Sequence, residues 1–137
     1  MSEYAVSTKN LSVAYSDKPV IWKLNIDVEK GSRTAIVGPN GAGKSTLIKA
    51  VMKLIKPVSG KSYIAGSTHK SALKQVAYVP QKGEVNWDFP ATVFDVVLMG
   101  RYVHKGLFKR PDKKDKDIAS AALETMKMTQ YKNRQIS

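Results

Sequence analysis

Residues 38–46 read Gly38-Pro39-Asn40-Gly41-Ala42-Gly43-Lys44-Ser45-Thr46. The stretch matches the phosphate-binding loop G-x-x-x-x-G-K-[ST], with an apolar run, 34–37, before it and a helical pattern, 45–54, after it. Glycine at 38, 41 and 43 lets the backbone adopt conformations closed to residues with a Cβ, so several N–H groups can point inward together. With the partial positive charge at the start of the following helix, these donors predict a socket for a polyphosphate.

Each side chain of the loop has an expected role in this socket. Lys44 is expected to reach the β- and γ-phosphates, and the Ser45 hydroxyl to complete the shell of a Mg²⁺ ion. The Thr46 N–H or hydroxyl can reach an α-phosphate, while the remaining loop residues contribute backbone donors. The alternative, a glycine-rich turn with a surface lysine, fits the complete motif less well.

Bulk properties exclude several classes of protein. A chain of 137 residues is one domain or part of one. It has no run of the roughly 20 apolar residues that a membrane-spanning helix needs, and its first residues do not resemble a secretory signal. It has no cysteine, which excludes disulfides and thiolate metal sites and fits a reducing cytosol.

The formal charge of +12 is unusual. It permits a nucleic-acid partner, an anionic membrane surface, or a basic subunit of a larger assembly. Much of the excess lies in the run 105–117, where aspartates interrupt the lysines. This mixed run favours a solvated helix face.

Hydrophobic periodicity predicts an α/β chain, with a β-rich part followed by a helical part. Turn chemistry is expected at 16–19, and Pro57 and Gly60 should end the helix after the loop. The expected strands are 4–8, 11–15, 24–28, 34–37, 61–65 and 76–79. The expected helices are 45–54, 91–102 and 114–128, the last with Ile118, Ala121, Ala122, Met126 and Met128 as its apolar residues.

Two further residues matter because of their spacing from the loop. Tyr15 ends a short strand 23 residues before Gly38, where its ring could stack on a nucleobase or simply pack at a strand end. Gln81 follows a strand and a proline, 37 residues after Lys44. A lone glutamine there is otherwise a solvent-facing loop residue.

Together these features resemble the nucleotide-binding subunits of ABC transporters. The resemblance implies that Tyr15 is the adenine-stacking A-loop residue, that residues 38–46 are Walker A, and that Gln81 is the Q-loop glutamine, which contacts Mg²⁺ or the attacking water. It implies a P-loop NTPase fold of ABC type that binds ATP and Mg²⁺. Residues 1–82 would form the β subdomain and the Walker A part of an incomplete RecA-like core, and 83–137 the beginning of the helical subdomain.

Residues 83–90, 92–97 and 100–101 are similar to the manganese, zinc and iron importers of this family. That similarity implies a peripheral subunit on the cytoplasmic face of the membrane, working with a second ATP-binding subunit and a membrane permease. Trp87 and Phe89 are candidates for the permease contact, or else pack into the helical part. No nucleic-acid partner is expected, and His69 and His104 are read as ordinary surface residues rather than zinc ligands.

The sequence lacks the family's signature motif, Walker B strand, D-loop and switch histidine. We therefore expect weak binding of ATP or ADP and essentially no hydrolysis. The apolar face formed by Leu47, Val51 and Leu54, together with an open strand edge, is expected to meet water and favour self-association.

Three other functions stay open at this point. They are a soluble ABC-type ATPase acting on nucleic acid or ribosomes, a nucleotide kinase, and a regulatory nucleotide binder without hydrolysis.

Overall fold

The computed structural model describes residues 3–15, 18–81, 90–105 and 109–136. These residues form two compact units, which divide after Tyr78 and are described here one at a time. The boundary lies near the predicted subdomain boundary at 82. The assignment of 1–82 and 83–137 to two parts of an ABC domain stays a prediction.

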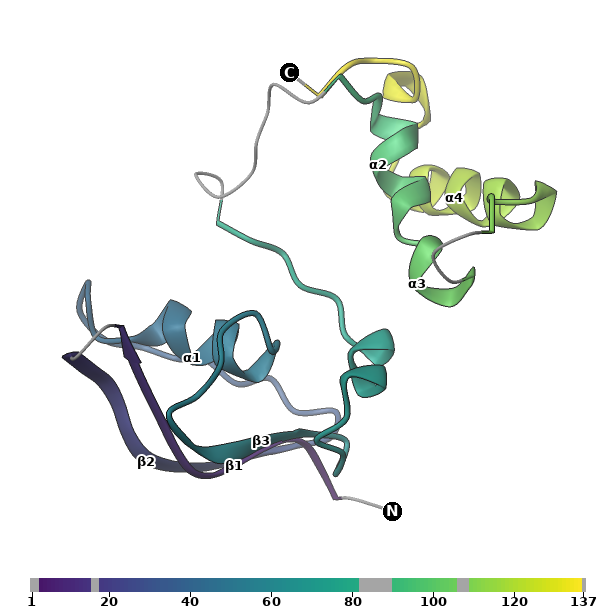
Figure 1. Ribbon diagram of the computed structural model, residues 1–137. Helices are drawn as coiled ribbons and strands as arrows, with labels where there is room; N and C mark the ends of the chain where they lie inside the picture. Colours follow the sequence, from purple (N-terminus) through teal and green to yellow (C-terminus); the bar gives the residue numbers. More distant parts are fainter. Residues whose placement is uncertain (1–2, 16–17, 82–89, 106–108, 137) are drawn as a thin grey trace. The chain divides into compact units, whose positions relative to one another are not determined.

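The first unit is an antiparallel sheet with one α-helix over a face (Figure 1). The strand order is β2-β1-β3, so β1 is central and pairs with both neighbours. Its elements are β1 (Tyr4–Tyr15), β2 (Lys18–Glu29), α1 (Lys44–Val51), β3 (Ser59–Ile64) and the 3-10 helix η1 (Lys70–Gln75).

Strand β1 joins the two predicted strands 4–8 and 11–15 into one element with an irregular register between Thr8 and Leu11. Asn10 takes a left-handed conformation there (φ 47°), and its N–H donates to Asn25 Oδ1 at 2.8 Å. The Asn25 side chain thus supplies the bond that the irregular ladder does not. The strand continues because this local bond satisfies the displaced backbone.

The core of the first unit lies between α1 and the sheet. Leu47 and Ala50 on α1 are buried against Leu11, Val13 and Ile21 of β1 and β2. The expectation that Leu47 would meet water is therefore wrong. Leu54 is 59% exposed because α1 ends at Val51, earlier than the predicted helix 45–54.

Two predicted strands are absent from the described residues. Segments 34–37 and 76–79 form no strand, and Val37 and Val79 are 90% and 89% exposed. A strand needs a hydrogen-bonded neighbour, and the three-stranded sheet offers these segments none. The predicted turn at 16–19 is also wrong in part, since Lys18 and Pro19 already belong to β2, while residues 16 and 17 lie outside the described ranges.

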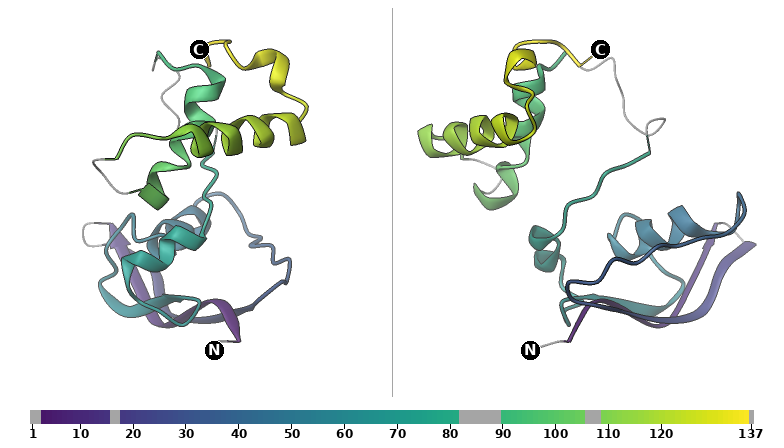
Figure 2. Two further views of the ribbon diagram at one scale, coloured as in Figure 1. Left: turned by 90° about the vertical axis from the view of Figure 1, so that its right-hand side faces the viewer. Right: turned by 180° about the vertical axis from the view of Figure 1, so that it is seen from behind.

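The second unit is helical, as expected. Helix α4 crosses α2 in both views of Figure 2. Backbone bonds from Val93 N–H to the Arg134 carbonyl and from Phe94 N–H to the Lys132 carbonyl tie the last residues to the start of α2. The elements are α2 (Val93–Met99), α3 (Tyr102–Lys105), α4 (Lys113–Thr125) and the 3-10 helix η3 (Thr129–Tyr131).

The predicted helix 91–102 is split in the structure, because Gly100 ends α2 and α3 begins at Tyr102. Thr92 and Asp95 form a capping box that starts α2. Helix α4 buries Asp115, Ala119 and Leu123, spaced four residues apart. The predicted apolar face is wrong, since Ile118, Ala121, Ala122, Met126 and Met128 are all exposed.

No helix of the described ranges is long and apolar enough to cross a membrane.

Candidate functional site

The loop before α1 depends on two glycines in the left-handed region. Gly41 has φ 83° and Gly43 has φ 87°, conformations that L side chains rarely adopt. Gly38 does not have a positive φ, and a Cβ there would lie 3.4 Å from Ala42 Cβ, an ordinary contact. The expectation that all three glycines serve backbone conformation therefore holds for Gly41 and Gly43 and is wrong for Gly38.

Gly43 also brings the loop against strand β2. A Cβ on Gly43 would lie 2.9 Å from Val20 Cγ1 and 3.3 Å from the Val20 carbonyl oxygen. The absence of a side chain is thus required twice, by the backbone conformation and by the neighbouring strand. This close approach fixes the start of α1 beside β2.

The Lys44 ammonium folds back over the loop. Its Nζ donates to the carbonyl oxygens of Gly38 and Pro39, both at 2.6 Å. A further bond, from Ala42 N–H to the Pro39 carbonyl at 3.2 Å, tightens the turn. The cation is therefore held at the loop, within reach of any anion that the loop binds.

The N-terminus of α1 is open to an anion. Its cap residue is Gly43, no side chain caps the helix, and its first turn contains no acidic residue. The amide groups and the partial positive charge of the helix end are therefore not neutralised by a protein carboxylate. With Lys44, this chemistry fits a phosphate group.

A pocket of about 270 Å³ lies beside the loop. Sequence reasoning missed its wall on β2, which includes Val20, Ile21 and Trp22, because nothing local connects this strand with the loop. Trp22 is 69% exposed. The opposite wall consists of Ile36, Val37, Ala42, Gly43, Lys44 and Leu47, with Leu24 from β2 completing the lining.

Tyr15 lies at the end of β1, opposite Lys18 on β2, and is half exposed. It does not line the described pocket. The strand pair that carries it nevertheless reaches the loop, since Gly43 lies against Val20 and Ile21 on the same hairpin. Stacking by Tyr15 stays a prediction.

The remaining predicted residues divide between the two units. Ser45 is exposed in the first turn of α1, and Thr46 is buried there. Gln81 is exposed and belongs to the second unit, so its relation to the loop stays a prediction. Trp87 and Phe89 lie outside the described residues.

The two histidines belong to no metal-binding group among the residues that the structure describes. The described ranges contain no group of three or more His, Cys, Asp or Glu side chains that could hold a metal ion. His69 is exposed and caps η1 by accepting a bond from Ser71 N–H, and His104 is exposed on α3.

The second unit contains a buried charge cluster that the sequence did not reveal. Asp115 is 1% exposed and accepts from Arg101 Nε at 3.1 Å and from Lys105 Nζ at 3.0 Å. Lys105 also contacts Asp112, the cap residue of α4. The capping box formed by Asp112 and Asp115 was a signal in the sequence, but its cationic partners were not.

Burial alone would raise the pKa of the Asp115 carboxyl. The Asp112 backbone N–H, Lys105 and Arg101 outweigh that effect and hold the pKa well below its ordinary range. Asp115 is therefore an ionised, fully partnered carboxylate. It joins α4 to α3 and to the turn between α2 and α3.

Comparison with known proteins assigns the fold. A family model described as "ABC transporter" matches residues 21–137. The chain belongs to the ABC transporter family. The match includes the loop, Gln81 and the whole helical unit of this ABC chain, which confirms the P-loop NTPase fold predicted from Walker A.

Curated relatives of this ABC chain are ATP-binding proteins of metal transport systems. It is 48% identical to the "Zinc transport system ATP-binding protein TroB" of Treponema pallidum (strain Nichols), over 98% of this chain and 50% of that protein. It is 48% identical to the "Manganese transport system ATP-binding protein MntB" of Bacillus subtilis (strain 168), over 98% of this chain and 54% of that protein. The chain thus spans about half the length of the curated relatives that it matches.

Solved structures agree with this assignment. A metal-chelate type ABC transporter in an inward-facing conformation matches with a TM-score of 0.76 and 31% identity, over 98% of this chain and 49% of that one. An ATP-binding cassette in its ADP conformation matches with a TM-score of 0.75 and 21% identity, over 98% of this chain and 58% of that one. The second likeness supports the fold alone.

Proposed function

We propose that this ABC chain is the nucleotide-binding part of the ATP-binding subunit of an importer for a divalent metal ion such as manganese, zinc or iron. The observation that carries the proposal is the Walker A loop, with Gly41 and Gly43 in the left-handed region and the Lys44 ammonium held over the loop. The named activities of the zinc and manganese relatives support the substrate class.

The loop would hold the phosphates of ATP. The backbone N–H groups from Gly38 to Thr46 would donate to the phosphate oxygens, and Lys44 would exchange its two carbonyl partners for phosphate oxygens. Ser45 and Gln81 would bind the accompanying Mg²⁺, which neutralises charge on the phosphates during phosphoryl transfer. Tyr15 would stack on the adenine ring.

The whole subunit would use ATP binding and hydrolysis to drive transport through a membrane permease, paired with a second ATP-binding subunit at the cytoplasmic face of the membrane. Trp87 and Phe89 are the candidates for the permease contact. The 137-residue chain itself would bind nucleotide weakly and hydrolyse essentially none, because residues that hold the metal and polarise the attacking water are not found in its sequence.

Calorimetric titration with Mg²⁺-ATP tests the nucleotide site. Removing the Lys44 ammonium deletes a charge-assisted contact of about 1.5–3 kcal/mol, so Lys44→Ala should weaken binding about 10- to 150-fold. Lys56→Ala, an exposed lysine beyond α1, is the matched control and should bind like the parent chain. Equal binding by all three proteins would refute the assignment of the loop.

Two further measurements test the rest of the proposal. Phosphate release by the chain above that of Lys44→Ala would contradict the expected lack of hydrolysis. Uptake of manganese and zinc by cells whose importer subunit has the Lys44→Ala change tests the cargo. Unchanged uptake of both metals would refute the transport role.

A further inference from the structure

In the mixed run 105–117, which leads into α4, the fold treats the acidic and the basic side chains differently. Asp112 and Asp115 are both engaged by Lys105, and Asp115 also by Arg101. These two carboxylates are therefore compensated within the helical unit. Of the aspartates in the run, Asp115 is buried, and Asp112, although exposed, is paired with Lys105.

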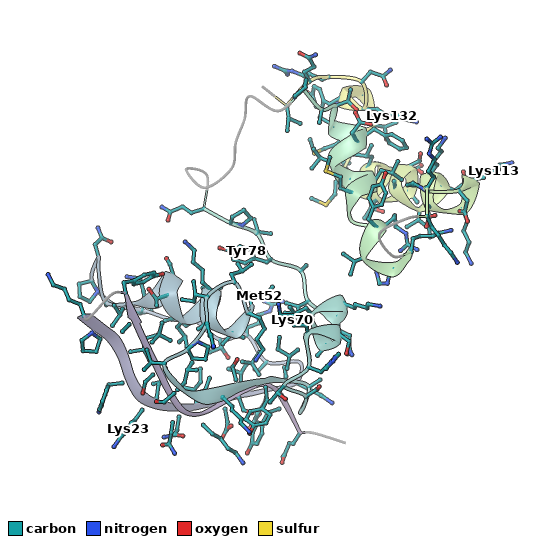
Figure 3. The ribbon with its side chains drawn as sticks, in the orientation of Figure 1. Lys23, Met52, Lys70, Tyr78, Lys113 and Lys132 are labelled. Atoms are coloured by element: carbon teal, nitrogen blue, oxygen red, sulfur yellow. The ribbon has the colours of Figure 1, made fainter. Side chains whose placement is uncertain are left out.

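What remains at this end of α4 is strongly cationic. The exposed side chains of this region are Lys109, Arg110, Lys113, Lys114 and Lys116, with Asp112 and Asp117 as the accompanying carboxylates. No described residue forms an ion pair with any of these five cations. Figure 3 shows the Lys113 side chain extending away from the helix. We call these five residues the basic surface.

Three lysines of the basic surface lower the stability of α4, the helix on which they lie. Lys113, Lys114 and Lys116 lie in the first turn of α4, where positive charge opposes the helix dipole. The helix end itself is capped by Asp112, so it is not the binding element. Because these lysines lower the stability of their own helix, their position indicates a role in binding another molecule.

Helix α3 of the same unit has two exposed side chains with apolar surface. Lys105 holds α3 at the start of α4, and on α3 Tyr102 and Val103 are 46% and 50% exposed. A tyrosine with an aliphatic neighbour fits the boundary between lipid headgroups and hydrocarbon.

We propose that the basic surface binds the anionic phospholipid headgroups of the membrane beside the transporter. The inference rests on the proposed function, because an importer subunit works next to a lipid surface. Each lysine near an anionic membrane contributes about fivefold to binding. Several cations acting together give a salt-dependent contact that would help to hold the helical unit at the membrane.

Vesicle flotation tests the proposal and separates lipid-bound protein from aggregates, which sediment. The chain should float with vesicles of phosphatidylglycerol and phosphatidylcholine, float less as salt rises, and stay behind with phosphatidylcholine alone. The triple variant Lys113→Gln, Lys114→Gln and Lys116→Gln should lose partitioning on the order of a hundredfold. Its helix should be no less stable by circular dichroism, since the changes remove charges that oppose the dipole.

A matched control carries the same loss of charge in the other unit. Lys61→Gln, Lys70→Gln and Lys74→Gln change exposed lysines of β3 and η1 and should leave flotation nearly unchanged. An equal loss in this control, or equal flotation with neutral vesicles, would overturn the proposal. Duplex RNA that displaces the chain from vesicles at equal phosphate concentration would assign the surface to nucleic acid and overturn it as well.

Nucleotide titration keeps the two proposals apart. The α4 triple variant should bind Mg²⁺-ATP like the parent chain, because its changes lie outside the loop. Flotation without nucleotide binding would refute the proposed function alone. Nucleotide binding without flotation would refute the membrane contact alone.

Discussion

Lys53 Nζ donates to both the carbonyl oxygen and the hydroxyl oxygen of Ser62, each at 2.7 Å. Lys53 follows α1 in a left-handed conformation (φ 58°), and Ser62 is buried in β3. The Ser62 hydroxyl in turn lies 3.5 Å from the Ala50 carbonyl of α1. The pair therefore fastens the end of α1 to the edge of the sheet, next to the core beneath the Walker A helix.

Lys53→Met should lower the free energy of unfolding by about 1–2 kcal/mol, because two oxygens of a buried serine lose their donor. Met preserves the apolar stem, so the change isolates the ammonium. Urea unfolding followed by circular dichroism measures the effect. Lys56→Met, at an exposed position, is the control, and equal losses in the two variants would contradict the role of the pair.

Burial lowers the pKa of Lys53 below its ordinary value of 10.5. Between the lowered pKa and 10.5, the unfolded chain binds more protons at this residue than the folded chain does. The contribution of Lys53 to stability should therefore rise with pH across that window. The difference in unfolding free energy between the parent and Lys53→Met should grow as pH rises toward 10.5, and a constant difference would contradict this.

Gly60 should be the glycine of the first unit least tolerant of a side chain. A Cβ at Gly60 would lie 2.1 Å from the Asn10 carbonyl oxygen, in a residue with φ 77°. Gly31 has nearly the same φ, 76°, with nothing within 4 Å of its Cβ position. Gly31→Ala should cost about 1 kcal/mol from backbone strain alone, and Gly60→Ala about 1–3 kcal/mol more from the clash. Similar unfolding midpoints for the two variants would refute this.

Several features were predictable because they are local. The Walker A residues, the helix after them and the helical character of the second half follow from motif and periodicity. Strands 34–37 and 76–79 were predicted wrongly, because a strand depends on neighbours that a local pattern does not supply. The face of α4 was misassigned because Arg101, from the turn before α3, and Lys105, from α3, make a buried site for Asp115, where an apolar residue was expected.

Asp115 should make the helical unit sensitive to acid. Its pKa is lowered in the folded state, so its contribution to stability is present above the ordinary carboxyl pKa and is lost as pH falls toward the lowered value. The parent chain should lose helical signal at lower urea concentration as pH falls from about 5 to 2. Asp115→Asn should be less stable at neutral pH and show a flatter dependence, whereas parallel curves would count against this role.

Tyr15→Ala should weaken binding of Mg²⁺-ATP by about 1–3 kcal/mol, because the stacking surface for the base is removed. Tyr15→Phe keeps the ring and should bind like the parent. Tripolyphosphate offers the same charges without a base, so its affinity should be equal for all three proteins. A loss for tripolyphosphate as large as that for ATP would show that Tyr15 acts on the loop and not on the base.

Asp112 uses its two carboxylate oxygens for different tasks. Oδ1 accepts the Asp115 N–H at 3.0 Å and thereby starts α4, while Oδ2 contacts Lys105 of α3. A shift in the first residue of α4 would therefore also disturb one of the two carboxylate contacts that hold Lys105 of α3. The Asp112 side chain thus determines where α4 begins and helps to attach α3 to it. We therefore expect the start of α4 and its contact with α3 to be lost together.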